Sequence, residues 1–192
     1  MFIFLLYMSA SLMELMEKYK EEYLKKNGKN TLFKKNQKID CAKEMSQKFS
    51  LEDMIRRTIF NIPNTNRIVF DYNAYKLYAH PDNFDTIIEG VISVYDDLLT
   101  RYQTFEVHML LNSFSISAAE RYKSAINSFV NRCMNSNTEY SNLITNIFIY
   151  HTPSMMESIS TLLKPFIDES INNKIIYYTK AESDELLKKL FS

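Results

Sequence analysis

The histidines and cysteines are the side chains of this sequence best suited to catalysis or metal binding. His80, His108 and His151 are not spaced as metal ligands, and Cys41 and Cys133 belong to no Cys-x-x-C or Cys/His pattern. A zinc site and a disulfide framework are therefore both unsupported, and we expect no metal and no cofactor. Two isolated cysteines are typical of a reducing environment, which favours a cytoplasmic protein.

His151 is the histidine whose position best suits contact with a ligand. It directly follows Ile147 to Tyr150, an apolar run typical of a strand covered on both faces. Ligand sites of α/β proteins lie at the carboxyl ends of strands. The alternative is that His151 only ends the strand, with its ring hydrogen-bonded inside the protein. His80 lies in a His-Pro-Asp turn, and we expect it to face solvent.

Motifs of the common enzyme classes are missing from the sequence. With two glycines in the whole chain, neither a P-loop nor a G-x-G-x-x-G motif can be present, and no serine lies between glycines as in a G-x-S-x-G elbow. The acidic pairs Asp96-Asp97 and Asp184-Glu185 fall on predicted helices, where a solvated surface explains them better than acid and base catalysis. We therefore assign no catalytic residue and expect a protein that is not an enzyme.

The bulk composition indicates one globular unit without a general affinity for nucleic acid. A chain of 192 residues can bury a sizeable core, and 23 basic residues against 23 acidic ones leave no overall positive field. The apolar run Phe2 to Met8 is much shorter than a membrane span and has no basic residues before it, which argues against a signal peptide.

Bulky apolar side chains are abundant. The chain has 13 Phe, 13 Tyr and 10 Met, and methionine in particular suits irregular or adaptable apolar surfaces. An ordinary core explains this composition, and an apolar binding cavity is the alternative.

The first 60 residues are predicted to be helical and rich in lysine. Apolar residues recur at helical spacing over residues 3–26, which predicts a helix ending near Gly28. Residues 18–48 carry ten lysines against four acidic residues, a local net charge of +6. A solvated linker and helix surface explain this charge, and a patch for anionic lipid is the alternative. Ser50 is predicted to cap a further helix reaching about Phe60.

Strands and helices alternate through the rest of the chain. Predicted strands cover residues 67–72, 105–111, 147–150 and 175–178, and predicted helices cover residues 83–102, 118–134, 154–163 and the segment after Thr179. The pairs Ser117/Glu120, Ser154/Glu157 and Thr179/Glu182 are predicted to form capping boxes. This order predicts an α/β fold with a mostly parallel sheet, right-handed crossovers and helices packed on the sheet.

The C-terminal strand, helix and strand carry a more specific pattern. Its segments are Ile147 to Pro153, Leu163 to Asp168 and Lys174 to Tyr177, with Asn66 to Tyr72, Phe105 to Leu111 and Ser113 to Ser117 upstream. This pattern resembles the CRAL-TRIO lipid-binding family, in which a strand ends in an Asn-Ala-Pro-like turn and is followed by a helix, a Lys-Pro-Phe-Leu-Asp block and a short last strand. The resemblance extends over residues 60–192 and is greatest to the divergent short form found beside Rho GTPase-activating and BCH-type scaffolding modules.

The resemblance implies a sheet floor and a mobile gate helix around an apolar cavity for one hydrophobic ligand, such as a phospholipid. It divides the chain into an N-terminal helical, Lys-rich segment, residues 1–60, and a CRAL-TRIO-like lipid-binding domain, residues 61–192. The implied function is non-enzymatic lipid binding or lipid transfer. The implied floor is Val69, Val107, Met109, Phe148 and Tyr150 or their opposite-face neighbours, and the implied gate is Met155, Ile159, Leu162 and Leu163 with Phe166.

Departures from the family pattern keep a second function open. Leu110 stands where the family has an acidic residue, His151-Thr152-Pro153 replaces the Asn-Ala-Pro turn, and no basic group for an inositol phosphate is visible. The alternative is a structural or scaffolding protein that keeps the fold without lipid and binds protein partners. In the lipid-binding interpretation, the apolar N-terminal helix and the Lys-rich stretch would dock the protein on anionic membranes, peripherally.

Overall fold

The computed structural model describes residues 2–28, 34–136, 138–167 and 169–191. Residues 29–33 of the Lys-rich stretch and Asp168 of the Lys-Pro-Phe-Ile-Asp block lie outside this description. The described residues form a five-stranded sheet in the order β1-β2-β3-β4-β5, parallel except where β1 pairs antiparallel with β2. The strands are β1 (Ile59–Asn61), β2 (Arg67–Asp71), β3 (Phe105–Leu110), β4 (Ile144–Tyr150) and β5 (Ile175–Tyr177). The predicted α/β fold is confirmed.

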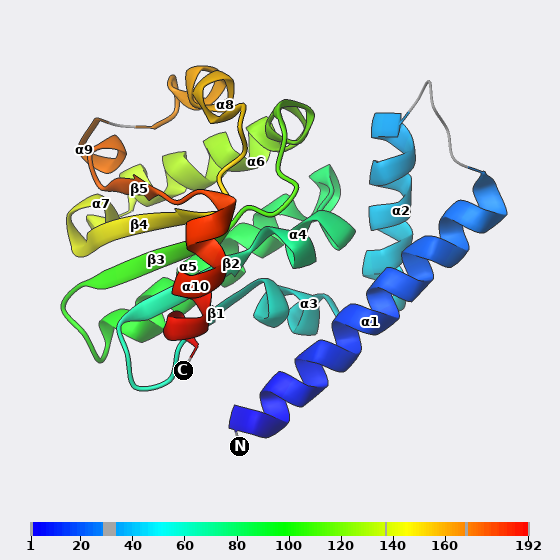
Figure 1. Cartoon of the computed structure of the whole chain (residues 1–192), viewed down its shortest axis with the longest axis horizontal. Coiled ribbons are helices and arrows are strands. Elements are labelled where there is room, and N and C mark those ends of the chain that lie inside the picture. The colour runs from blue at the N-terminus through cyan, green and yellow to red at the C-terminus, as the bar shows by residue number, and fades with distance from the viewer. Residues whose placement is uncertain (1, 29–33, 137, 168, 192) are drawn as a thin grey trace.

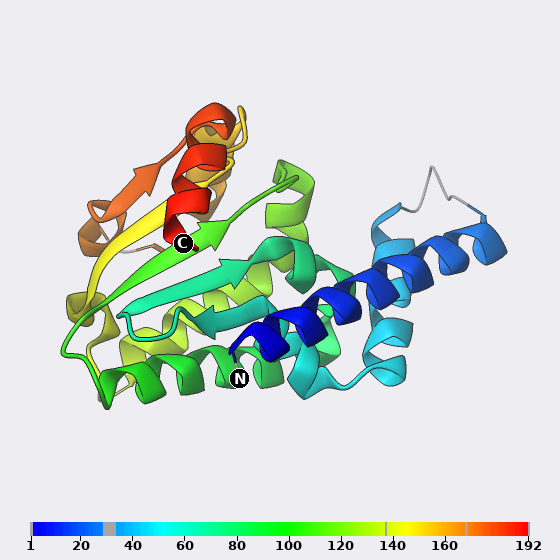
Figure 2. The same ribbon diagram turned by 60° about the horizontal axis from the view of Figure 1, so that its bottom comes forward.

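Helices cover both faces of this sheet (Figures 1 and 2). Each connection between parallel strands leads to the next strand of the sheet, always in the same direction across it. Because these crossovers are right-handed, the connecting helices lie on one face of the sheet. The C-terminal helix α10 lies on the other face. The long helices are α1 (Phe2–Asn27), α2 (Lys34–Lys48), α5 (Phe84–Leu99), α6 (Ile116–Asn135) and α10 (Lys180–Leu190); the shorter ones are α3 (Leu51–Thr58), α4 (Tyr72–Tyr78), η1 (Pro81–Asn83), α7 (Tyr140–Leu143), α8 (Met156–Leu163) and α9 (Glu169–Asn172). None of the described helices is long and apolar enough to span a bilayer.

The strand register assigns each side chain to one of two faces. Ile68, Val107 and Ile147 are register partners, and they point into the main core beneath α5 and α6. Their neighbours Val69 and Phe148, which alternate to the opposite side, contribute to a second cluster beneath α10. Both faces of the sheet are thus apolar because both are covered by helices.

The N-terminal helices share the main core of the sheet. Met16 of α1, Met45 of α2 and Met54 of α3 are fully buried in the cluster that also holds the sheet residues beneath α5. Residues 60 and 61 both lie within β1, so the predicted boundary between the two segments falls inside a strand. Helix α1 ends as predicted at Gly28, whose φ of +66° is the left-handed conformation that glycine adopts at least cost.

Two predicted elements differ from the structure around the first strands. The helix predicted from Ser50 to Phe60 ends at Thr58, and Ile59 continues in extended conformation as β1. The sequence pattern does not predict α4, which starts immediately after β2. Its N-cap is Asp71, whose carboxylate accepts a hydrogen bond of 2.8 Å from the backbone N–H of Asn73.

Two of the three predicted capping boxes are wrong. Helix α6 is capped by Ser115 instead of Ser117, since the Ser115 hydroxyl accepts from the backbone N–H of Ala118. Helix α8 begins two residues later than predicted, and its N-cap, Met155, makes no side-chain capping bond. The box of Thr179 and Glu182 at the start of α10 is confirmed, with both reciprocal hydrogen bonds formed.

Candidate functional site

Helix α8, which carries the predicted gate, packs against helix α6 through an apolar cluster of its own. Ile159 of α8 and Ala119 of α6 are fully buried there, and Leu163 is nearly so. The partly buried members of this α8 cluster are Phe114, Ile116, Ile126, Met156, Leu162, Phe166 and Ile167. The four predicted gate residues Ile159, Leu162, Leu163 and Phe166 therefore lie together, whereas Met155 is half exposed.

Met156 connects the α8 cluster to the main core. It packs against both clusters, as do Phe114 and Ile126. The sheet residues Ile147 and Ile149 belong to the main core on the same face. Met156 is thus the residue of α8 through which this helix contacts the main core of the sheet.

The segment that leads into α8 is anchored to the sheet and to α10. His151 has a φ of +53°, and its backbone N–H donates a hydrogen bond of 2.8 Å to Oγ of Ser183. The next backbone N–H, of Thr152, donates to the carbonyl of Tyr178. Nε2 of His151 lies 3.2 Å from Oδ1 of Asp184, so this imidazole has a partner in its own chain.

The predicted floor residues are divided between the two faces of the sheet. Val107 and Met109 face the main core beneath α5 and α6, with Val107 buried and Met109 partly buried. Val69, Phe148 and Tyr150 belong to the cluster beneath α10, which also contains Leu190. The five residues cannot all line one cavity, because the alternation of β-strands separates them.

An aromatic stack that includes a buried histidine lies beneath α10. The ring of His108 is stacked on that of Phe148, with 4.8 Å between centroids, and its Nδ1 lies 2.9 Å from the hydroxyl of Tyr150. Phe148 and Tyr150 both also contact the ring of Tyr178. Nε2 of His108 is buried with no hydrogen-bond partner among the described residues, and Oε2 of Glu106 lies 3.6 Å from it. No local pattern in the sequence predicts this stack.

The buried imidazole of His108 predicts a loss of stability in mild acid. Burial, helped by the positive charge of Arg67, lowers the pKa of His108 to about 4. An unfolded chain binds this proton at a pKa of about 6.5, so stability falls as the pH drops from about 6.5 to 4. The loss over this window is at most about 3 kcal/mol. Urea unfolding at neutral pH and at about pH 5 measures it, and His108→Phe is expected to reduce the difference. An identical pH dependence in wild type and variant would contradict this assignment.

His80 is buried, and the prediction that it faces solvent is wrong. Its ring accepts a hydrogen bond from the backbone N–H of Asp82, and its Nε2 lies 2.9 Å from Oγ of Ser46 on α2. Burial is the main cause that lowers the pKa of His80. The side chain of His80 thus joins η1 to the N-terminal helices, and a structural role accounts for it.

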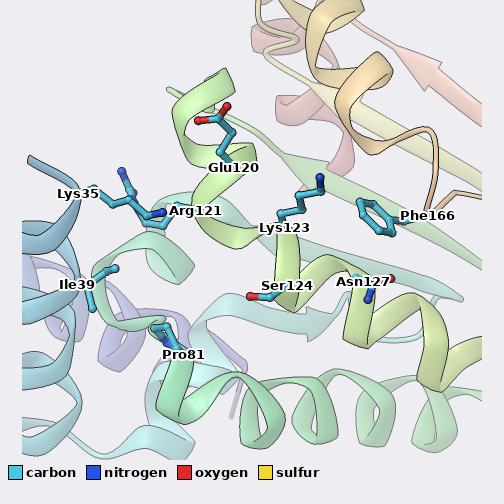
Figure 3. A pocket seen from close by; sticks show the side chains of 9 residues that line it. All are labelled: Lys35, Ile39, Pro81, Glu120, Arg121, Lys123, Ser124, Asn127 and Phe166. Carbon is cyan, nitrogen blue, oxygen red and sulfur yellow. The ribbon is translucent and has the colours of Figure 1, made fainter.

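A cleft of about 520 Å³ opens between α2, η1 and α6, close to the segment that follows α8 (Figure 3). Its walls come from parts of the chain that are far apart in sequence. The residues that line it are Lys35, Ile39, Pro81, Glu120, Arg121, Lys123, Ser124, Asn127 and Phe166. Phe166 is the predicted gate residue that the α8 cluster and this cleft share. Within the part of the chain that the structure describes, no three His, Cys, Asp or Glu side chains are grouped as metal ligands.

Comparison with known proteins agrees with this architecture. The family model described as CRAL/TRIO domain matches residues 111–191, which include α6, β4, α8, β5 and α10. Among solved structures, the chain is similar to the crystal structure of Sfh5, with 12% sequence identity and a TM-score of 0.52 over 88% of this chain and 79% of that one. No curated protein sequence matches the chain. The family match in sequence and the likeness in fold concur with the motif around Lys164-Pro165-Phe166. Residues 111–191 therefore match the CRAL/TRIO domain family, and the fold of the chain is similar to that of Sfh5.

Proposed function

We propose that this chain binds, and transfers between membranes, one hydrophobic ligand such as a phospholipid, and that it has no enzymatic activity. The site would be apolar and closed by helix α8. The observation that supports this best is the packing of α8: the helix adheres to α6 through its own apolar cluster, with Ile159 at the centre. Opening there would break apolar contacts without breaking any strand pairing, and the acyl chain of a ligand would replace those contacts.

The ligand is proposed to lie on the face of the sheet that carries α6. Val107 and Met109 would then belong to the floor, and Met156 would move out with the gate. Val69, Phe148 and Tyr150 would support α10 on the opposite face instead. The prolines at both ends of the gate segment, Pro153 and Pro165, limit the helix and fit a hinge at each end.

Matched substitutions on opposite faces of the sheet, one in β3 and one in β2, test this placement. Val107→Phe is expected to reduce uptake of a fluorescent phospholipid from donor vesicles severely, because the added ring occupies the proposed site. Val69→Phe, beneath α10, is expected to cost about 1–3 kcal/mol through overpacking but to leave uptake near wild type. Urea unfolding of both variants separates stability from uptake. If Val69→Phe alone reduces uptake, the ligand lies beneath α10 and the proposed placement is wrong.

A scaffolding protein without a ligand is the second candidate, and one observation favours it. Buried side chains pack closely in the main core, among them the rings of Tyr75 and Tyr122, whose centroids are 4.9 Å apart. Such a protein would use the CRAL-TRIO surface to bind other proteins. It would take up no phospholipid in the same assay, with or without the substitutions.

Contact with membranes is proposed as the step that delivers the ligand. Lysines of α1 and α2 would attract the protein to anionic lipid, each contributing roughly 1 kcal/mol when close to the surface. This corresponds to a cytoplasmic protein that associates peripherally with membranes. Part of the lysine set has partners within the chain, since Lys43 pairs with Asp82 at 2.7 Å and Lys48 lies over the ring of Tyr19.

A further inference from the structure

Three cationic side chains meet in the cleft between α2 and α6. Lys35 extends from α2, while Arg121 and Lys123 extend from α6 (Figure 3). Glu120 is the one carboxylate among the residues that line the cleft. Three positive charges against one negative charge leave this cleft basic, although the chain as a whole carries no net charge.

None of these cations is neutralised by an acidic partner within the described part of the chain. The guanidinium of Arg121 lies over the ring of Tyr122 at 5.5 Å, and the ammonium group of Lys123 lies over the ring of Phe166 at 5.4 Å. Nε of Arg121 is buried and has no hydrogen-bond partner among the described residues. Like charges that share a cleft repel one another, and a buried donor without a partner is costly, so an anion with several acceptor oxygens would relieve both.

We propose that this cleft binds a phosphate-bearing anion. A guanidinium matches the oxygens of a phosphate group in a forked, two-bond geometry, and a lysine adds a point charge. Ser124 and Asn127 supply neutral donors within the same cleft, and Phe166 supplies an apolar surface for an uncharged part of the ligand. The site goes beyond the proposed lipid function, because its polar lining lies outside the apolar α8 cluster.

Two binding assays distinguish the sources of the phosphate. Isothermal titration calorimetry uses inositol hexakisphosphate as a soluble probe. Sedimentation uses phosphatidylcholine vesicles with and without phosphatidylinositol 4-phosphate. The variants are Arg121→Gln and Lys123→Gln, and the control is Lys188→Gln, an exposed lysine of α10 on the other face of the sheet. Lys123 is exposed, so its variant stays informative even if Arg121→Gln fails to fold.

Each substitution in the cleft is expected to raise the Kd roughly tenfold, since the free energy of one hydrogen bond to a charged group corresponds to about a tenfold change in affinity. Added salt is expected to weaken it further, and Lys188→Gln is expected to leave it unchanged. Binding of the soluble probe supports a free phosphate compound as ligand, and binding only to the phosphoinositide vesicles supports a lipid headgroup. Binding in neither assay, or equal losses in the cleft variants and the control, would overturn the proposal. Uptake of a fluorescent phospholipid by the cleft variants is measured separately. This second measurement distinguishes a failure of the phosphate-site proposal from a failure of the proposed lipid-binding function.

Discussion

A disulfide between cysteines introduced at Ala119 and Ile159 is expected to abolish phospholipid uptake, and its reduction is expected to restore it. Both positions are fully buried, one on each side of the contact between α6 and α8. The crosslink would hold α8 on α6, and a gate that cannot open admits no ligand. The background would carry Cys41→Ala and Cys133→Ala, because both native cysteines are free thiols. Uptake from vesicles is measured before and after reduction.

The reduced form of the same protein is the matched control for this experiment, since it has the same substitutions without the crosslink. Ala119→Cys alone, under oxidising conditions, controls for the oxidant. Mass spectrometry under denaturing conditions verifies that the crosslink has formed. Uptake by the fully crosslinked protein at the rate of its reduced form would show that α8 is not the gate.

Asp71→Ala is expected to have the largest effect on stability, with a loss of about 3–5 kcal/mol in the free energy of unfolding. The carboxylate of Asp71 is buried and pairs with the guanidinium of Arg57 at 3.0 Å. Its removal leaves Arg57, which is largely buried, without this partner. The same carboxylate caps α4 through Asn73. Because Arg57 belongs to α3, the pair connects the N-terminal helices to the sheet.

Asp71→Asn separates the two roles of this side chain. An asparagine can still cap α4 but cannot pair as a charge with Arg57, so it is expected to cost about 1 kcal/mol less than alanine. Urea unfolding of the two variants beside the wild type gives both values. A loss below about 1 kcal/mol for Asp71→Ala would mean that the pair contributes no more than a surface ion pair.

Much of the C-terminal fold follows from local patterns. Continuous apolar runs such as Ile147 to Tyr150 predict strands covered on both faces, and the structure confirms β4 there. The capping box at Thr179 is a purely local pattern, and it too is confirmed. Helix α4 could not be predicted from hydrophobic periodicity, because five of its seven residues are buried and it has no amphipathic stripe.

The candidate site could not be predicted from short sequence patterns, because it depends on how the helices pack on the sheet. Which face of the sheet Val69 or Val107 occupies relative to α6 follows from the handedness of the crossovers and the position of α10, since both faces are equally apolar. The basic cleft combines Lys35 with Arg121, which are brought together by the packing of α2 beside α6. His80 is buried because α2 covers the turn in which it lies, a contact that the turn itself does not encode.

The lipid content of the natively purified protein tests most directly whether this chain holds a lipid, as we propose. The protein would be purified without detergent, extracted with organic solvent and analysed by mass spectrometry, with the Val107→Phe variant processed in parallel. We expect a lipid in stoichiometric amount in the wild type and much less in the variant. Absence of any lipid from the wild type, together with no uptake from vesicles, would contradict the account and favour the scaffolding function.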